Sequence, residues 1–372
     1  MTENKIGIID STLREGEQAP GVSFTGTTRR AIIRYLHRVG VDEIELGVAS
    51  PVNNYLTQLV ADARKITDGL CTLGLWCRCQ EVDIAFAASC RPDMLSLSIP
   101  ASDLHINERL GKSRNWVQSR LASSIRQALA LNIPAISVGL EDASRADPHF
   151  LLTLAKIAED SGACRIRLAD TVGICTPEAV KQLIHPLKNT LKVDIGVHCH
   201  NDFGMATANS ITALQAGARW LDATVLGLGE RAGNCRLEEV VGYLALNRQN
   251  KQYRPELLSE LCCYVAEVAE IWVPENHPIV GENIFTCETG LHQHGLSVNP
   301  GTYEPYDPKL VGTRRKLRFG HKTGKRAVNI ELARQGVYLS ETQAGQLAAC
   351  VRSNGKTLSA EQLQRFADKI IQ

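Results

Sequence analysis

The stretch "VDIGVHCHND", residues 193–202, joins a strand-like run to two histidines that are one residue apart. In a β-strand the side chains alternate between faces, so His198 and His200 point the same way and Cys199 points away. Their α-carbons would lie roughly 6.6 Å apart, which allows both imidazoles to bind one ion. The pattern alone leaves two interpretations open: a metal site, or a pair of hydrogen-bonded histidines in the wall of a barrel.

This stretch is the seventh of eight short apolar runs that alternate with amphipathic, helix-like segments. Eight repeats of strand and helix predict a parallel (β/α)8 barrel (a TIM barrel), with a doubly wound open sheet as the alternative. The runs lie at residues 6–10, 42–48, 72–78, 94–100, 135–142, 165–173, 193–202 and 221–231. Polar residues follow the first, sixth, seventh and eighth runs, where a barrel places its chemistry.

The C-terminal third of the chain has a different character. From about residue 275 the sequence is rich in Pro, Gly, Asn and His, and two or three helical segments follow, one of them with Ser340 as its expected N-cap. We therefore expect a barrel domain over 1–270, an extended arm over 271–330 that covers a barrel mouth, and a helical subdomain over 331–372.

The overall composition indicates an ordinary globular protein. The formal net charge is +1, so no field of one sign recruits nucleic acid or a membrane surface, and an anionic substrate must be held by a few local cations. The 12 cysteines include no CxxC pair, the start of the chain does not resemble a signal peptide, and no apolar run is long enough to span a membrane. These features predict reduced thiols and a cytoplasmic protein.

The segment "DSTLREGEQAPG", residues 10–21, follows the first run directly. One interpretation is a solvated loop in which Arg14 pairs with a neighbouring acid. The other is an anion clamp beside a metal-binding carboxylate, because the guanidinium fork matches a planar carboxylate. One acid of this segment, together with His198 and His200, would form a two-histidine, one-carboxylate site with open positions for water and substrate.

The order DSTLREGEQ, HCHND, GLGERAGN resembles the Claisen-condensing metalloenzymes on TIM barrels, which include homocitrate, isopropylmalate and citramalate synthases. The stretches "LWCRCQEVDIA", "LSIPASDLH", "GLEDASRAD" and "GMATAN" are most similar to the homocitrate synthases of nitrogen-fixing bacteria. The resemblance implies an acyltransferase that condenses acetyl-CoA with a 2-oxo acid, first of all 2-oxoglutarate to give homocitrate. It also implies a divalent metal ion, which could be Mg, Mn, Co or Zn.

Carried over by motif position, the resemblance implies roles for individual residues. The implied metal site comprises Glu15, His198, His200 and, as a ligand or a neighbour of the ligands, Asn234. The implied contacts of the 2-oxo acid are Arg14, Gln18 and Thr171, with Gln80 where lysine-pathway relatives carry a histidine. Arg14 would contact the 2-oxo group and the carboxylate beside it, so it also counts as a catalytic candidate.

The arm supplies the remaining catalytic candidates. In the family the corresponding arm reaches the barrel of the neighbouring subunit, which implies that His292 is the base or proton relay and that Tyr303 is its partner. The same resemblance implies a homodimer with a swapped C-terminal arm. Without it, both residues could be ordinary loop residues.

The chain departs from the family pattern at positions that bear on the substrate. Gly196 stands where homocitrate synthases usually carry Glu, and Ser137 stands where the lysine-pathway relatives carry Arg. The segment "GHKTG", residues 320–324, replaces the usual GKHSG. Phosphonopyruvate, giving 2-phosphonomethylmalate, is therefore an alternative acceptor, as are 2-oxoisovalerate and pyruvate. The candidate contacts for a distal anionic group are Arg78, Arg145 and His105. A metal-dependent carbon–carbon lyase of the same superfamily is a further alternative, and a pure binding role is another.

Overall fold

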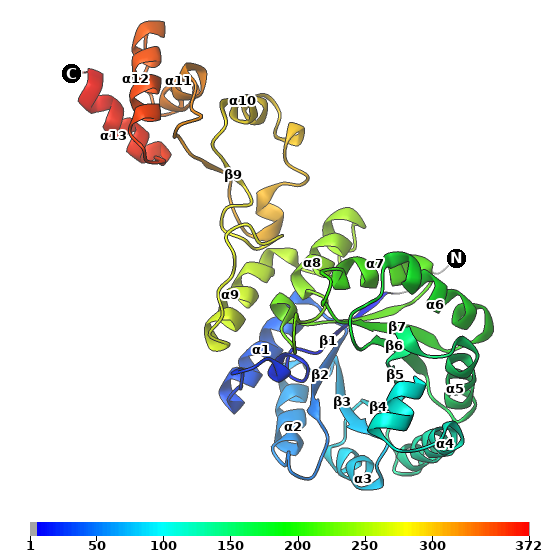
Figure 1. The fold of residues 1–372 in the computed structure, drawn as a ribbon. Helices are drawn as coiled ribbons and strands as arrows, with labels where there is room; N and C mark the ends of the chain where they lie inside the picture. The colour runs from blue at the N-terminus through cyan, green and yellow to red at the C-terminus, as the bar shows by residue number, and fades with distance from the viewer. Residues whose placement is uncertain (1–5, 372) are drawn as a thin grey trace. The chain divides into compact units, whose positions relative to one another are not determined.

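The computed structural model describes residues 6–371 of the chain. The chain forms two compact units that divide between Trp272 and Val273 (Figure 1). We call the first the barrel unit and the second the C-terminal unit, and each is described by itself. Apart from residues 271 and 272, the arm and the helical subdomain expected from the sequence lie in the C-terminal unit.

The barrel unit contains eight parallel strands that pair in sequence order, and β8 returns to pair with β1. The strands are β1 (Gly7–Asp10), β2 (Glu43–Val48), β3 (Thr72–Arg78), β4 (Met94–Pro100), β5 (Ile136–Glu141), β6 (Arg165–Asp170), β7 (Asp194–Cys199) and β8 (Trp220–Ala223). Because the sheet closes on itself and has no edge, the prediction of a (β/α)8 barrel is confirmed and the open sheet is excluded.

The last strand is shorter than the run from which it was predicted. β8 ends at Ala223, and the chain then makes a short helical turn at Val225–Gly227, in which Leu226 adopts a left-handed φ of 58°. The polar "GLGERAGN" motif therefore forms a loop beyond the C-terminal end of the strand instead of continuing it. The loop continues to Asn234, which forms an isolated antiparallel β-bridge with His200, the residue after the end of β7.

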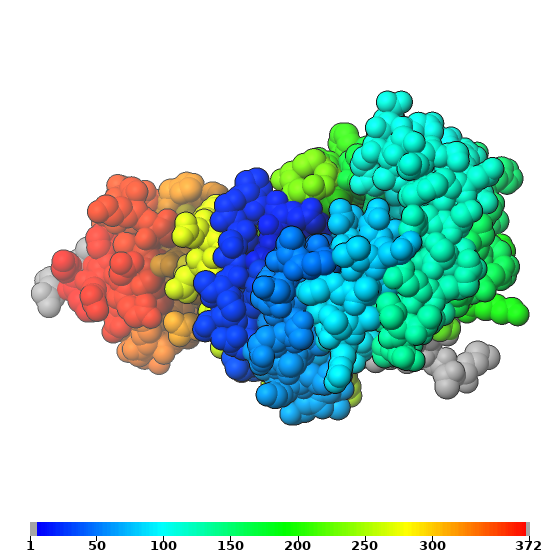
Figure 2. All heavy atoms as spheres, turned by 90° about the horizontal axis from the view of Figure 1, so that it is seen from below, coloured from blue at the N-terminus to red at the C-terminus, as the bar shows by residue number. Residues whose placement is uncertain are grey.

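Helices surround the strands of the barrel unit (Figure 1). They are α1 (Gly26–Val39), α2 (Leu56–Ile66), α3 (Glu81–Cys90), α4 (Arg114–Ala130), α5 (Pro148–Asp160), α6 (Pro177–Thr190), α7 (Ala206–Ala216), α8 (Leu237–Gly242) and α9 (Leu258–Val268). Side chains cap several of them, as Asp147 does at the start of α5. Figure 2 shows the first helices following one another across one face, from blue to cyan.

The C-terminal unit has its own apolar core. Its elements are β9 (Thr286–Cys287), α10 (Gly290–Val298), β10 (Lys316–Leu317), α11 (Lys325–Arg334), α12 (Glu341–Ser353) and α13 (Ala360–Ile371). The core gathers around Phe319, Val328 and Leu347. Ser340 caps α12 as the sequence predicts, since its side chain accepts from the backbone N–H of Gln343 in a capping box.

Two expectations about the chain's environment can be compared with the structure. All 12 cysteines are free thiols, and most of them are buried, in agreement with the expectation of reduced cysteines. Between residues 6 and 371, no helix combines the length and the apolar character that crossing a membrane requires.

Candidate active site

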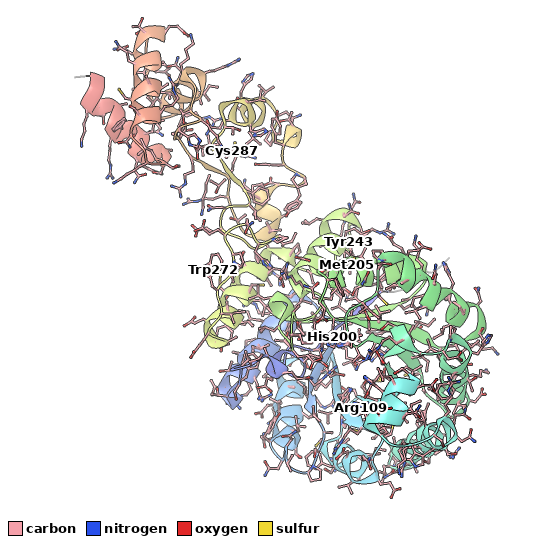
Figure 3. All side chains as sticks on the ribbon, viewed as in Figure 1. Arg109, His200, Met205, Tyr243, Trp272 and Cys287 are labelled. Atoms are coloured by element: carbon pink, nitrogen blue, oxygen red, sulfur yellow. The ribbon has the colours of Figure 1, made fainter. Side chains whose placement is uncertain are left out.

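A cavity of about 200 Å³ opens at the C-terminal ends of the barrel strands. The residues that line it are Arg14, Glu15, Gln18, Val48, Trp76, Ser98, Arg109, Gly139, Glu141, Arg167, Ala169, Thr171, His198, His200 and Glu230. In Figure 3, His200 lies within the ring of helices of the barrel unit. The cavity thus brings together residues from the C-terminal ends of all eight strands or from the loops that follow them, as the barrel architecture predicts.

Glu15, His198 and His200 converge in this cavity. One donor atom from each residue lies within 4.8 Å of the other two. The Nε2 atom of His198 is 3.8 Å from one carboxylate oxygen of Glu15, and the Nε2 atom of His200 is 3.9 Å from the other. The two imidazole centroids are 4.9 Å apart, as expected for neighbours on one face of β7.

The Nδ1 atom of each histidine is engaged in a hydrogen bond. His198 Nδ1 lies 2.8 Å from the carboxylate of Asp222, and His200 Nδ1 lies 2.7 Å from the backbone oxygen of Thr171. When Nδ1 donates to these oxygens, Nε2 keeps its lone pair and faces Glu15. This arrangement orients both rings before any ion binds.

Burial keeps the two imidazoles neutral. Desolvation lowers the pKa of His198 to about 4, although Asp222 opposes the change, and it also lowers the pKa of His200. The Oε2 atom of Glu15 and the Nε2 atom of His200 are buried and lack a hydrogen-bond partner among the described residues. A buried carboxylate oxygen and a neutral imidazole nitrogen without partners, with His198 beside them, form a donor set that fits a divalent cation.

A buried network of charges connects these groups to Arg14. Arg14 contacts Glu15 and donates from Nε to Glu45 at 2.6 Å. Arg167 lies 3.2 Å from the other oxygen of Glu45 and 3.0 Å from Asp222. Burial disfavours the ionised form of Glu45, but Arg14 and Arg167 outweigh this effect and hold its pKa below the usual range. Burial lowers the pKa of Arg14 itself.

The other residues expected at the barrel mouth have different positions. Gln18 and Thr171 line the cavity. Asn234 lies beside His200, donates from its amide to Leu228 O at 2.8 Å, and has a buried Oδ1 that no described residue contacts. An oxygen without a hydrogen-bond partner among the described residues agrees with both roles expected for Asn234, a metal ligand or a neighbour of the ligands.

Gln80 does not line this cavity. β3 ends at Arg78, and the chain turns outward so that Gln80 becomes the exposed N-cap of α3. Trp76 of the same strand lines the cavity instead, and its ring lies 5.6 Å from the guanidinium carbon of Arg14. The position of Gln80 therefore does not support the expected substrate contact.

The structure also adds residues that the sequence reasoning missed. Arg109, from the helical turn after β4, lines the cavity and contacts Glu141, which also accepts from Ser98 at 2.7 Å. The three cations suggested from the sequence for a distal anion, Arg78, Arg145 and His105, are not among the lining residues. A basic residue shortly after a barrel strand was the available signal for Arg109.

His292 and Tyr303 lie together in the C-terminal unit. Their ring centroids are 4.3 Å apart in an edge-to-face arrangement, and both line a separate pocket of about 280 Å³. The Nδ1 atom of His292 is 2.5 Å from the hydroxyl oxygen of Thr289. The expected pairing of His292 with Tyr303 thus occurs within the C-terminal unit itself.

Comparisons with known proteins place this geometry in a family. The HMGL-like family matches residues 5–262, and the homocitrate synthase post-HMGL domain-like family matches residues 279–359. The chain belongs to the HMGL-like family. A homocitrate synthase of Frankia alni is 40% identical to this HMGL-like chain over 339 residues, covering 90% of this chain and 95% of the relative.

Other relatives carry related names. A 2-isopropylmalate synthase 2 of Caldanaerobacter subterraneus is 35% identical over 357 residues, which cover 94% of this HMGL-like chain and 91% of the relative. The solved structure of an HMG-CoA lyase from Bacillus subtilis has a TM-score of 0.65 at 21% identity, covering 73% of this chain and 96% of that one, and it supports the fold alone. With homocitrate synthase homologues at 38% and 40% identity, this HMGL-like protein is an enzyme of the acyltransferase type.

Proposed function

We propose that this HMGL-like enzyme condenses acetyl-CoA with a 2-oxo acid, and that its acceptor is 2-oxoglutarate, giving homocitrate and CoA. The observation that carries the proposal is the convergence of Glu15, His198 and His200 beside Arg14 in one buried cavity. The names of the relatives support the same reaction class, because homocitrate synthases and isopropylmalate synthases both occur among them.

The barrel residues bind and orient the 2-oxo acid in this proposal. A divalent ion held by Glu15, His198 and His200, with Asn234 beside them, would polarise the ketone of the acceptor. Arg14 presents a guanidinium to the carboxylate next to that ketone. The Thr171 hydroxyl already accepts the N–H of Asp142 at 2.8 Å, so its own proton remains to be donated to the same carboxylate. Gln18 adds an amide donor at the cavity wall.

His292 is the proposed base. The hydrogen bond between Thr289 and His292 Nδ1 leaves Nε2 to take a proton from the acetyl methyl group, with Tyr303 as its partner. The acids that line the barrel cavity beside Glu15 are engaged elsewhere, since Glu141 contacts Arg109 and Glu230 contacts Arg231. The enolate carbon then bonds to the ketone carbon, and water cleaves the thioester to release CoA.

Arg109 supports a dicarboxylic acceptor. 2-Oxoglutarate carries a second carboxylate, and burying that charge requires a second cation besides Arg14. Arg109 provides such a cation at the wall of the cavity. We propose that this residue, and not Gln80, meets the distal carboxylate.

An activity screen tests the proposal. Release of CoA thiol from acetyl-CoA is followed with 2-oxoglutarate, 2-oxoisovalerate, pyruvate and phosphonopyruvate, with and without a chelator, and the products are identified by mass spectrometry. The expected result is homocitrate formed with the highest kcat/KM and lost on metal removal. Preference for another acceptor would overturn the assignment of 2-oxoglutarate. No thiol release with any acceptor, together with pyruvate formation from a 3-hydroxy acid, would indicate a lyase.

A further inference from the structure

A pocket of about 530 Å³ in the C-terminal unit has an unusual concentration of positive charge. We call it the basic pocket. Its lining residues are Arg314, Arg315, Lys316, Leu317, Arg318, Glu331, Arg334, Ser359, Ala360 and Glu361. Five cationic side chains face two carboxylates, which leaves three positive charges in excess. The entire chain has a formal charge of only +1, so this excess is local.

The basic pocket is lined by three segments of the C-terminal unit: residues 314–318 at β10, Glu331 and Arg334 of α11, and residues 359–361 at the start of α13. On one side β10 pairs with β9, and Arg318 N donates to Cys287 O at 2.9 Å. On the other side the chain enters α13 at Ala360. Phe319 and Leu358 exchange two backbone hydrogen bonds, of 2.9 and 2.7 Å, which hold the two sides next to each other. Hydrogen bonds therefore fix the backbone at Lys316, Arg318 and Phe319, and Arg314 lies two residues before β10.

Three of the five cations already have acidic partners. Arg315 donates to both oxygens of Glu304, and Lys316 lies 2.9 Å from Glu282. Arg334 lies 3.7 Å from Glu331, measured from its guanidinium nitrogen to the carboxylate oxygen. Each of these pairs neutralises charge within the C-terminal unit.

Arg314 and Arg318 make no ion pair within residues 6–371. Both arginines act on Glu361, whose pKa is lowered first by the hydrogen bond from Ser359 and also by their charges, and Arg318 also contributes to the lowered pKa of Glu282. Glu361 stands in the first turn of α13, where the helix dipole favours a negative group. The pocket thus holds two guanidinium groups without an ion-pair partner among the described residues, next to a helix N-terminus.

We infer that the basic pocket binds the phosphate groups of a small phosphorylated ligand. Guanidinium groups bind phosphate oxygens through paired N–H donors, and a multiply charged anion suits Arg314 and Arg318, the two lining cations without an ion-pair partner among the described residues. Two sources share this chemistry. One is the nucleotide end of coenzyme A, which carries three phosphate groups. The other is a free phosphate compound that has no part in the reaction. The inference does not depend on which 2-oxo acid the enzyme uses.

Calorimetric binding to the full-length protein tests this inference. The probes are inorganic pyrophosphate, adenosine 3′,5′-bisphosphate, CoA and 3′-dephospho-CoA. The double variant R314Q/R318Q is expected to bind pyrophosphate and the bisphosphate about tenfold or more weakly than the wild type, because both charge-assisted contacts are lost. The matched control is Arg326→Gln on α11, an exposed cation outside the pocket, which should bind as the wild type does.

A second variant tests the inference in the opposite direction. Glu361→Gln removes the internal anion that competes for Arg314 and Arg318, so it should bind pyrophosphate several-fold more tightly than the wild type. If CoA binds more tightly than 3′-dephospho-CoA and only R314Q/R318Q loses that difference, the source is the coenzyme. If pyrophosphate alone responds to the variants, the source is a free phosphate compound.

Equal affinity of the wild type, R314Q/R318Q and Glu361→Gln for pyrophosphate and the bisphosphate would overturn the inference. Because pyrophosphate is not a reactant of the proposed condensation, that result would leave the proposed function unaffected. Conversely, an inactive enzyme that still showed the expected pyrophosphate series would refute the proposed reaction and retain the basic pocket as a phosphate site.

Discussion

Asp222 connects the candidate metal ligand His198 to Arg14, the proposed contact of the substrate carboxylate. Its Oδ2 atom meets both His198 and Arg167, and Arg167 continues through Glu45 to Arg14. All of these side chains are buried, so each charge depends on its neighbours for compensation. The orientation of His198 and that of Arg14 are therefore coupled through a single chain of contacts.

This coupling predicts the effect of Asp222→Asn. A neutral amide accepts the Nδ1 proton of His198 more weakly than a carboxylate does, and it leaves Arg167 with less compensation. Loss of such an outer contact costs about 10- to 100-fold in metal affinity. Titration calorimetry with Mn²⁺ and Zn²⁺ measures this loss without a catalytic assay. Asp160→Asn, at the exposed end of α5, is the control and should leave affinity unchanged. Unaltered Mn²⁺ and Zn²⁺ binding by Asp222→Asn would contradict the positioning role.

Arg109 is predicted to select acceptors with a second negative charge. Arg109→Gln removes a charge-assisted contact worth about 1.5–3 kcal/mol, which should raise the KM for 2-oxoglutarate about 10- to 100-fold. Pyruvate lacks the distal carboxylate, so its KM serves as the internal control and should change little. A parallel rise for both acceptors would show that Arg109 supports Glu141 instead of contacting the substrate.

At the scale of secondary-structure elements, local sequence signals were reliable where one side chain decides the geometry. Ser340 and Gln343 satisfy each other's backbone groups at the start of α12, and both lie within one turn of sequence. The end of β8 was predicted less well. The run from Leu221 onward continues to look strand-like, but Leu226 takes a left-handed conformation and the following motif folds over the barrel.

The capping box leads to a prediction for the C-terminal unit. Ser340→Ala should lower the free energy of unfolding by about 1 kcal/mol, since the backbone N–H of Gln343 loses its acceptor. Urea unfolding monitored by circular dichroism measures the change. Ser353→Ala, at the other end of α12, is the control, because its hydroxyl donates only to Cys350 O within the helix. A loss as large for the control as for Ser340→Ala would argue against the cap.

Asp10, the last residue of β1, predicts a pH dependence of stability. Burial raises its pKa to about 7, although hydrogen bonds from Thr12 oppose the rise. Between its unfolded pKa of 3.8 and about 7, the folded state retains a proton that the unfolded state releases, so the contribution of Asp10 to stability falls as pH rises. Asp10→Asn lacks this titration.

The melting temperature of Asp10→Asn minus that of the wild type should therefore increase from pH 5 to pH 8. Differential scanning calorimetry at several pH values measures this difference, and the subtraction cancels the titration of groups that the two proteins share. A difference that does not change with pH would mean that Asp10 ionises normally in the fold.

At the scale of the whole molecule, the residues proposed for the reaction belong to both compact units. Glu15, His198 and His200 belong to the barrel unit, and His292 with Tyr303 belongs to the C-terminal unit. The family resemblance predicts that the arm of one protomer serves the barrel of its partner. That prediction can be tested by complementation.

Two inactive variants, His198→Ala and His292→Asn, are co-expressed with different tags and purified together. In a swapped dimer, random assembly makes about half of the dimers mixed, and each mixed dimer contains one intact site out of two. Activity of the unfractionated dimers should therefore return to about a quarter of the wild-type value. Co-expression of His198→Ala with His200→Ala is the control and should stay inactive, because both changes damage the barrel. No recovery in the first pair would show that each arm serves its own barrel or that the protein is a monomer.

The predictability of the site differs from residue to residue. His198 and His200 could be proposed from the motif at the end of the seventh run, and Glu15 could be proposed from the family resemblance of the segment after the first run. Barrel topology brings those two strand ends to one mouth. Gln80 stays a prediction as a substrate contact, since it is the N-cap of α3 and is not among the residues that line the cavity. Arg109 was missed, because a helical turn after β4 carries no periodic signal.

The sequence by itself determined the eight strand–helix repeats and the motifs at the strand ends, since hydrophobic periodicity and capping act between near neighbours in the chain. Only the tertiary structure decided which charges meet inside the barrel. Glu45 and Arg167, 122 residues apart, are brought within 3.2 Å of each other by closure of the sheet. A buried charge must find a compensating partner wherever the fold supplies one, and that partner is set by three-dimensional proximity and not by any local pattern.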